Sequence, residues 1–367
     1  MLRKSTLLIC ITVLVYACST STEIPGAPTD SFNRKGLLEH VAEAIIIPSI
    51  GNFNTELITL KSKVLAFNAT PNSLTLEDLR TSWFIAYKAW QHVEMFNVGK
   101  ANELAFVNYF NVYPTTVADI EANVIAGAYD LEHPNNHDAQ GFPALDYLIY
   151  GLATTDAEII EKYTTDSNAA NYKKYLLDVI TKMESIIALI VNDWNGSYKN
   201  EFINNSGNTT TSSLKQLVND YVFYIEKGLR AKKIGIPAGN FSDTALPEKV
   251  EGFYKQTASK ELALEALRAV NNMFGGNAFS SSTSGLSFKA YLEALDKGDL
   301  ATMIENQFHV AEAQVLSLDH NFYTQINTNN SEMTKAYDEL QKIVVLLKVD
   351  MLQTFNIGID YVDADGD

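Results

Sequence analysis

Residues Thr75–Glu94 read TLEDLRTSWFIAYKAWQHVE, and this stretch decides the fold class. Its large apolar residues recur at a spacing near 3.6, which places them on one face of an α-helix. They are Trp83, Ala86, Tyr87 and Trp90. Thr75, followed three residues later by Asp78, resembles a capping box, so the helix is expected to begin there. Glu94 continues the stripe and is expected on the same helix face.

The same period returns along the rest of the chain. Apolar stripes run through 214–228 and 333–351. Further helices are expected at 37–49, 54–67, 115–128, 156–162, 172–191, 259–274, 288–295 and 300–322. Runs rich in Asn, Ser, Thr, Gly or Pro at 204–213, 237–247 and 277–285 predict loops. Because strand patterns are almost missing, the sequence predicts an all-α protein.

The stretch 151–166 separates two halves, and each half has enough expected helices to form a bundle. We therefore expect two packed helical bundles, formed by residues 35–160 and 161–367, with a cleft between them.

The N-terminus predicts export and a lipid anchor. Arg3 and Lys4 precede an apolar run that is too short to span a bilayer, as in a secretory signal. The run ends before Cys18 in a stretch that resembles a bacterial lipoprotein box. The resemblance implies cleavage after residue 17 and acylation of Cys18, with 18–34 as anchor and flexible tether. An ordinary signal peptide with a chance cysteine is the alternative.

Cysteine content and charge limit the remaining function classes. Of the two cysteines, Cys10 leaves with the signal and Cys18 is expected to carry lipid, so the mature chain has no disulfide. The formal net charge of −16 becomes −18 once Arg3 and Lys4 are removed. Nucleic acid is therefore excluded as a partner, and membrane attachment is expected through acyl chains alone. Solubility in the cell envelope is the simpler explanation of the acidity.

One motif resembles a known family. Residues 141–151, GFPALDYLIYG, predict a short helix with Pro143 in its first turn. The motif resembles the signature of the imelysin family, Gly-x-His-x-x-Glu followed by an apolar run. Gly141 and the apolar run match, whereas Pro143 replaces His and Asp146 replaces Glu. Similar family segments occur at 83–99, Tyr113-Pro114, Trp194, 247–251, 348–350 and 359–367.

The resemblance implies a two-bundle envelope protein linked to iron acquisition, in a family once classed among metallopeptidases. It also implies a functional site between the bundles, near the signature helix. His and Glu three residues apart share a helix face and could hold a metal. Pro143 has no ligating atom, so a metal bound as in a typical member is not expected. Asp146 could contact a ligand or simply stabilise a helix start.

Four further residues are candidates for the ligand site. Glu94 is expected to face the cleft, and a structural salt bridge is its alternative role. Tyr113, Tyr147 and Trp90 are candidate wall residues of the same cleft. For each tyrosine the alternative is a core aromatic with one bonded hydroxyl group.

Two histidine-containing stretches are weaker candidates for a metal site. His133 and His137 lie in one loop, which also reads as a solvated turn. His309 and Glu312 have the spacing that is lost at Pro143, but they border an apolar helix stripe and are expected at the solvent. The acidic residues 363–367 imitate the start of a calcium loop but lack its distal Glu. The chain contains no His-Glu-x-x-His and no Gly-x-Ser-x-Gly motif.

These observations favour a lipid-anchored, non-catalytic protein of the bacterial envelope, attached to the outer membrane facing the periplasm or the cell surface. It is expected to bind a ligand between its bundles and to act with components of iron or haem uptake. Its cofactor is unknown, with iron or another divalent metal as the candidate. The alternatives are a metallopeptidase with a displaced metal site, at His309 and Glu312 or at His133 and His137, and an interaction scaffold whose site has decayed.

Overall fold

The computed structural model describes residues 30–361, except 208 and 210. The expected signal, lipidated Cys18 and most of the tether lie outside the described residues, as does the acidic stretch 363–367. Apart from a single bridge between Asn277 and Ser284, the described residues form helices, turns and loops. The all-α prediction is therefore confirmed. In this part of the chain, no helix has the length and hydrophobicity needed to cross a membrane.

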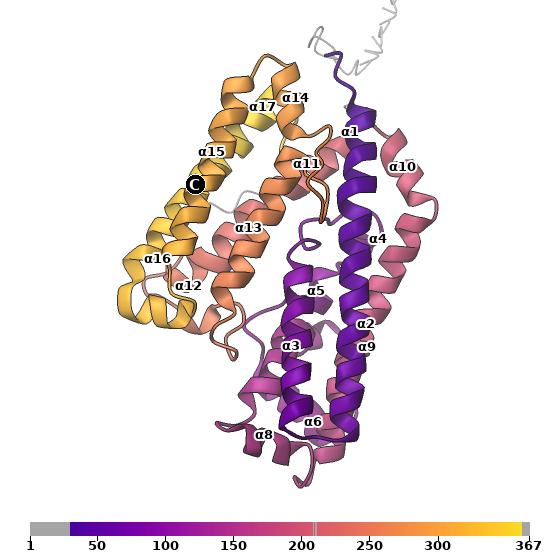
Figure 1. Cartoon of the computed structure of the whole chain (residues 1–367), viewed down its shortest axis with the longest axis vertical. Helices are drawn as coiled ribbons and strands as arrows, with labels where there is room; N and C mark the ends of the chain where they lie inside the picture. Colours follow the sequence, from indigo (N-terminus) through magenta and orange to yellow (C-terminus); the bar gives the residue numbers. More distant parts are fainter. Residues whose placement is uncertain (1–29, 208, 210, 362–367) are drawn as a thin grey trace, which may run out of the picture. The chain divides into compact units, whose positions relative to one another are not determined.

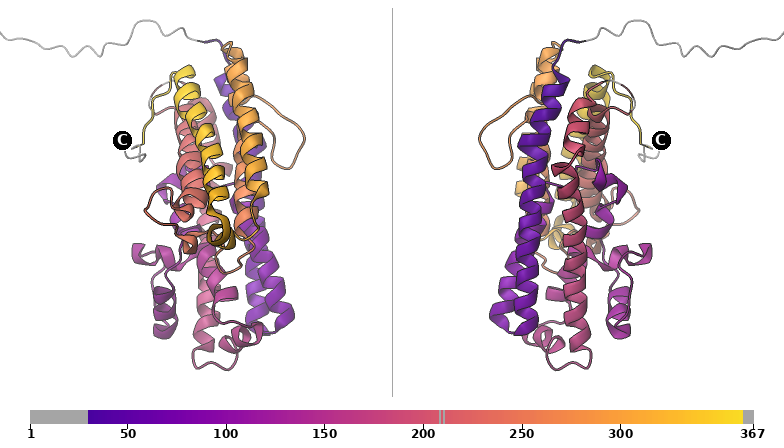
Figure 2. Two further views of the ribbon diagram at one scale, coloured as in Figure 1. Left: turned by 90° about the vertical axis from the view of Figure 1, so that its left-hand side faces the viewer. Right: turned by 90° about the vertical axis from the view of Figure 1, so that its right-hand side faces the viewer.

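One group of helices is built on a long N-terminal rod. Helix α1 (Arg34–His40), the π-helical η1 (Val41–Ile46) and α2 (Ile47–Ala69) follow one another without a break. Helices α3 (Ser73–Trp90) and α9 (Ala169–Asn195) pack along this rod, as Figures 1 and 2 show. They bury the apolar stripes that their sequences predict.

Shorter elements complete the N-terminal group. They are α4 (Lys100–Glu103), α5 (Val107–Phe110), α6 (Val117–Ala126), η2 (Pro134–Ala139), α7 (Gly141–Asp146), η3 (Tyr147–Gly151), α8 (Asp156–Lys162) and α10 (Tyr198–Asn204). The segment α7–η3 contains the signature motif, which therefore forms the predicted short helix.

The C-terminal group has its own set of helices (Figure 1). They are α11 (Ser213–Phe223), η4 (Tyr224–Gly235), α12 (Ile236–Ala238), η5 (Pro247–Lys249), α13 (Ser259–Gly275), α14 (Phe288–Ala294), α15 (Gly298–Ser317), α16 (Phe322–Val345), η6 (Leu346–Met351) and α17 (Leu352–Thr354). Helix α16 packs against both α15 and η4, and α13 packs against α15. The helix expected over 300–322 ends at Ser317, and Phe322 is the first residue of the next helix, α16.

The two groups belong to one compact unit, residues 32–367. Helix α9 packs against α2, α6 and α7, although it follows the expected division at residue 160. Packing therefore assigns the described residues up to α10 to the N-terminal group and those from α11 onward to the C-terminal group. The predicted boundary between two bundles, at residues 160 and 161, remains a prediction.

Helix α3 begins and ends earlier than its sequence suggested. Asn72, and not Thr75, is its cap: the side chain of Asn72 accepts the N–H of Thr75 at 3.0 Å, and Thr75 Oγ1 accepts the N–H of Asn72 at 3.1 Å. Asp78 instead pairs with Lys63 at 2.9 Å. The helix ends at Trp90, so Glu94 lies in the following turn and not on the helix.

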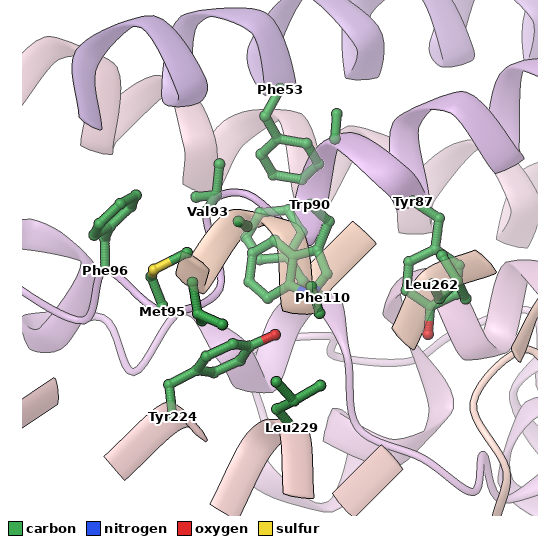
Figure 3. Packing of buried hydrophobic residues seen from close by; sticks show 14 of the residues in the cluster. Phe53, Tyr87, Trp90, Val93, Met95, Phe96, Phe110, Tyr224, Leu229 and Leu262 are labelled. Carbon is green, nitrogen blue, oxygen red and sulfur yellow. The ribbon is translucent and has the colours of Figure 1, made fainter. Parts of the chain in front are cut away.

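Aromatic side chains dominate the core between α2, α3 and α5 (Figure 3). Trp90 is completely buried, with its ring 5.4 Å from that of Phe53 and 4.8 Å from that of Phe110. Tyr224 approaches this cluster from the C-terminal group, with its hydroxyl toward it (Figure 3). The core thus continues from one group of helices into the other.

Replacing the cap of α3 should destabilise the protein measurably. Asn72→Ala leaves backbone N–H groups of the first turn without a partner, so the free energy of unfolding should fall by about 1 kcal/mol. Asn306→Ala, in the exposed interior of α15, is the matched control and should be neutral or slightly stabilising. Urea denaturation of both variants measures the difference, and equal stabilities would contradict the assigned cap.

Candidate functional site

The signature segment is fixed by contacts with α3 and α5. Gly141 has φ +77°, and a Cβ atom there would lie 2.4 Å from the carbonyl oxygen of Phe110. Only glycine fits this position without a shift of the backbone. Trp83 donates its indole N–H to the carbonyl of Phe142 at 3.2 Å, and the ring of Tyr87 stacks on that of Phe142 at 4.4 Å. The stripe that decides the fold therefore also positions the motif.

Asp146 joins this segment to the C-terminal group. Its carboxylate is 1% exposed and accepts the backbone N–H groups of Tyr254 and Lys255, at 2.8 and 3.0 Å. Burial raises the pKa of Asp146 to about 7, although the two N–H groups and the Lys255 ammonium act in the opposite direction. Both oxygens of the side chain are thus engaged by the protein itself.

A cavity of about 220 Å³ lies beside Asp146, and we call it the signature crevice. Pro143 and Asp146 line one side, Tyr113 another, and residues 248–254 of the C-terminal group the rest. The hydroxyl of Tyr113 is buried and has no hydrogen-bond partner among the described residues. Burial raises the pKa of this phenol well above its usual range. The electrostatic neighbours of this hydroxyl are Glu251, Glu94 and Tyr224, so it lies in the interior toward these residues, while the Tyr113 ring lines the crevice.

The structure places Asp146 and Tyr113 on the wall of the same cavity, which Tyr147, Trp90 and Glu94 do not line. Tyr147 turns its hydroxyl to Glu121, at 2.7 Å. Trp90 lies inside the aromatic core. Glu94 is buried, 6% exposed, and borders a different cavity, formed with η4.

A buried polar cluster joins the two groups of helices next to Glu94. We call it the junction cluster, and its members are Gln91, Glu94, Asn111, Tyr224, Lys233 and Glu251. Asn111 donates to Glu94 at 3.1 Å and to Glu251 at 2.8 Å. Tyr224 donates to Glu94 at 3.2 Å, and Gln91 donates to Glu251 at 3.2 Å. Glu94 is therefore bonded within the cluster and also borders a cavity, and its contact with a ligand stays a prediction.

Charge balance explains how two carboxylates can be buried here. The ammonium of Lys233 lies 2.7 Å from Glu251 and 3.6 Å from Glu94. Burial alone would raise the pKa of Glu251, but Lys233 and the hydrogen bond from Asn111 hold this pKa below its usual range. Removing one member of such a group leaves a buried charge without compensation.

Sequence reasoning missed Lys233, Asn111 and the role of Glu251. One signal was present for Lys233, because it continues the apolar stripe of Ile225 and Leu229 at steps of four residues. A charged residue in an apolar stripe needs a buried partner. Nothing local indicates which carboxylates provide it.

The weaker metal candidates each lie near solvent or beside other partners. His309 is exposed, and Glu312 pairs with Arg268 at 3.2 Å. His133 is exposed and accepts the N–H of Asn135 through its ring, at 3.2 Å. Burial lowers the pKa of His137, whose Nε2 atom is buried without a partner. Across the described residues, no three His, Cys, Asp or Glu side chains are arranged to hold a metal ion.

A bare divalent ion does not fit the signature crevice. Pro143 offers no ligating atom, and both oxygens of Asp146 already accept backbone N–H groups. A metal held by protein atoms needs several converging donors. The crevice is instead suited to recognition by shape and by contact with its aromatic walls.

The buried state of Asp146 should make stability depend on pH. Between about pH 4 and 7 the folded protein keeps the Asp146 proton, whereas the unfolded chain has already released it. The contribution of Asp146 to the free energy of unfolding is therefore fully present below pH 4 and is lost as the pH rises to about 7. The stability of wild type relative to Asp146→Asn should therefore fall by about 4 kcal/mol across this range. Urea denaturation at several pH values measures it, with the exposed Asp338→Asn as control. A difference that is constant with pH would contradict the assigned pKa.

Comparisons with known proteins agree with this geometry. The fold resembles the crystal structure of an imelysin-like protein from Psychrobacter arcticum 273-4, with TM-score 0.71 and 18% identity, covering 89% of this chain and 97% of that one. It also resembles a protein from Parabacteroides distasonis ATCC 8503 named an iron-regulated protein A precursor, with TM-score 0.75 and 17% identity, covering 90% and 97%. A search of curated proteins found no match.

The family comparison covers most of the chain. The family model for imelysin, peptidase family M75, matches residues 46–348, a range that contains the signature segment and the whole junction cluster. This chain therefore belongs to the imelysin family.

Proposed function

We propose that this protein is a non-catalytic, lipid-anchored binding protein of the bacterial envelope that takes a ligand into the signature crevice, in a pathway related to iron or haem uptake. The observation that carries the proposal is the cavity between the two groups of helices, which lies beside Asp146 and is walled by residues of both groups, among them Tyr113, Phe253 and Tyr254. Small-molecule sites are concave and largely lined by apolar and aromatic side chains.

The chemistry of the crevice favours binding over hydrolysis. The Asp146 carboxylate is held by two backbone N–H groups, and among the described residues no side-chain base hydrogen-bonds to it in the manner of a catalytic pair. Lys232 adds a positive charge nearby, because its ammonium lies 4.3 Å from the centre of the Tyr113 ring. A ligand with a hydrogen-bonding or negatively charged group is therefore favoured at this end.

The size of the crevice restricts what it encloses. A volume of about 220 Å³ is below the roughly 300–1,000 Å³ of pockets that enclose drug-sized ligands. The crevice thus accommodates a small ligand or one edge of a larger one, such as the carboxylate arm of a porphyrin or of an iron chelate. The iron context is carried over from the family and from the name of the Parabacteroides protein.

Ligand titration tests the proposal. Haemin and ferric citrate are the probes, and binding is followed by absorbance and tryptophan fluorescence. At least one probe should bind, and Phe253→Ala, which removes a ring from the crevice wall, should weaken it about tenfold, the effect of about 1.4 kcal/mol of lost contact. Tyr129→Phe removes a hydroxyl bonded to Asp178 outside the crevice and should change nothing.

The alternative outcomes are distinct. If neither probe binds, or if Phe253→Ala binds as wild type does, the crevice is not the site. Stoichiometric zinc in the purified protein, together with peptide cleavage that is lost in His309→Ala, would favour the metallopeptidase.

The lipid anchor is tested separately in cells. Metabolic labelling with palmitate should mark the wild-type protein, and Cys18→Ser should abolish both the label and the membrane fractionation, because the acyl chains are the expected attachment. Cys10→Ser is the control and should keep the label. A labelled Cys18→Ser variant would disprove the anchor.

A further inference from the structure

A second cavity, of about 390 Å³, lies on the other side of the junction cluster from the signature crevice. One wall is the face of α11 and η4 that carries Asp220, Phe223 and Tyr224. The opposite wall comes from the N-terminal group and includes Met95 and Val107. Its volume lies within the range of pockets that enclose small organic ligands, and most of its surface is apolar. We call it the α11 cavity.

The positive charges that border the α11 cavity are committed to other partners. Lys227 pairs with Glu226 at 2.7 Å. Lys232 donates to the carbonyl oxygen of Asn111 at 2.5 Å and lies over the Tyr113 ring. These two lysines therefore offer the cavity mainly their aliphatic stems. Glu94 shares the ammonium of Lys233 with Glu251 and accepts hydrogen bonds from Asn111 and Tyr224.

Asp220 is the remaining ionisable side chain that lines the α11 cavity. Among the described residues, none donates a hydrogen bond to its carboxylate or pairs with it as a cation. Its charged neighbour is another acid, Asp360, in a segment held beside α11 by hydrogen bonds between Asn219 and residues 358 and 360, both at 3.2 Å. Burial and Asp360 together raise the pKa of Asp220 to about 8. A carboxylate in this environment is stabilised by a cation from outside.

An exposed aromatic ring lies next to this carboxylate. Phe223 is 44% exposed although it borders the cavity, and its ring lies 5.1 Å from that of Tyr361. An aromatic face beside a carboxylate is the environment that organic cations prefer. A bare divalent metal fits less well. Calcium, for example, takes six or more oxygen ligands, and the two carboxylates that line this cavity, Glu94 and Asp220, stand beside mostly apolar walls.

We propose that the α11 cavity binds an organic cation with an apolar body, with its ammonium group at Asp220 and its hydrocarbon part between Phe223 and the wall formed by Met95 and Val107. The ligand class is thus a primary or quaternary amine that carries an alkyl or aryl group. This inference is independent of the proposed ligand of the signature crevice, because it uses a different cavity and a charge of opposite sign.

The test compares two probes of the same shape on the full-length protein. 2-Phenylethylamine is positively charged and 2-phenylethanol is neutral, and titration calorimetry at pH 9 measures both while Asp220 is ionised. The amine should bind at least tenfold more tightly than the alcohol. Asp220→Asn should remove this preference, whereas Asp338→Asn, at an exposed site on α16, should keep it.

Two further variants keep the test decisive. Phe223→Leu should weaken binding of the amine severalfold, and it provides the result if Asp220→Asn does not fold. Phe253→Ala should leave binding of the amine unchanged, which separates this site from the signature crevice. Equal binding of the two probes by wild type, no binding of the amine, or an unchanged preference in Asp220→Asn would overturn the proposal.

Discussion

The structure depends on one buried electrostatic arrangement, the ammonium of Lys233 between the carboxylates of Glu94 and Glu251. The charges come from both groups of helices, so neither group can leave the interface without exposing or isolating a charge. Asn111 completes the hydrogen bonding of both acids and prevents the isolated carboxylate that burial would otherwise penalise. These contacts therefore fix how the two groups of helices are aligned, because apolar contacts alone would allow one group to shift along the other.

The two cavities lie on either side of this arrangement and differ in character. The signature crevice is lined by the Tyr113 ring, over which the ammonium of Lys232 lies, whereas the α11 cavity has the carboxylate of Asp220 and an exposed aromatic ring. One junction thus offers environments of opposite polarity. Lys232 helps to separate them, because it borders the α11 cavity while its charge lies over Tyr113 on the other side.

The sequence predicted the fold well and the site only in part. Stripes at a period of 3.6 are local, so Trp83 and Trp90 were sufficient to indicate a buried helix, and the family resemblance indicated the neighbourhood of Asp146 and Tyr113. The junction cluster depends on partners more than 150 positions apart, such as Gln91 and Glu251, and no local pattern carries that information. Helix ends were also imprecise: the cap Asn72 was overlooked because Thr75, three residues on, is an equally good capping residue.

The contact made by Asp146 has a consequence for how such a protein can diversify. Its partners are main-chain amides, which every residue except proline supplies, so the side chains at 254 and 255 are free to vary without loss of this link. Tyr254 also borders the crevice. Ligand preference could therefore drift through substitutions at that position while the attachment between the helix groups is inherited unchanged.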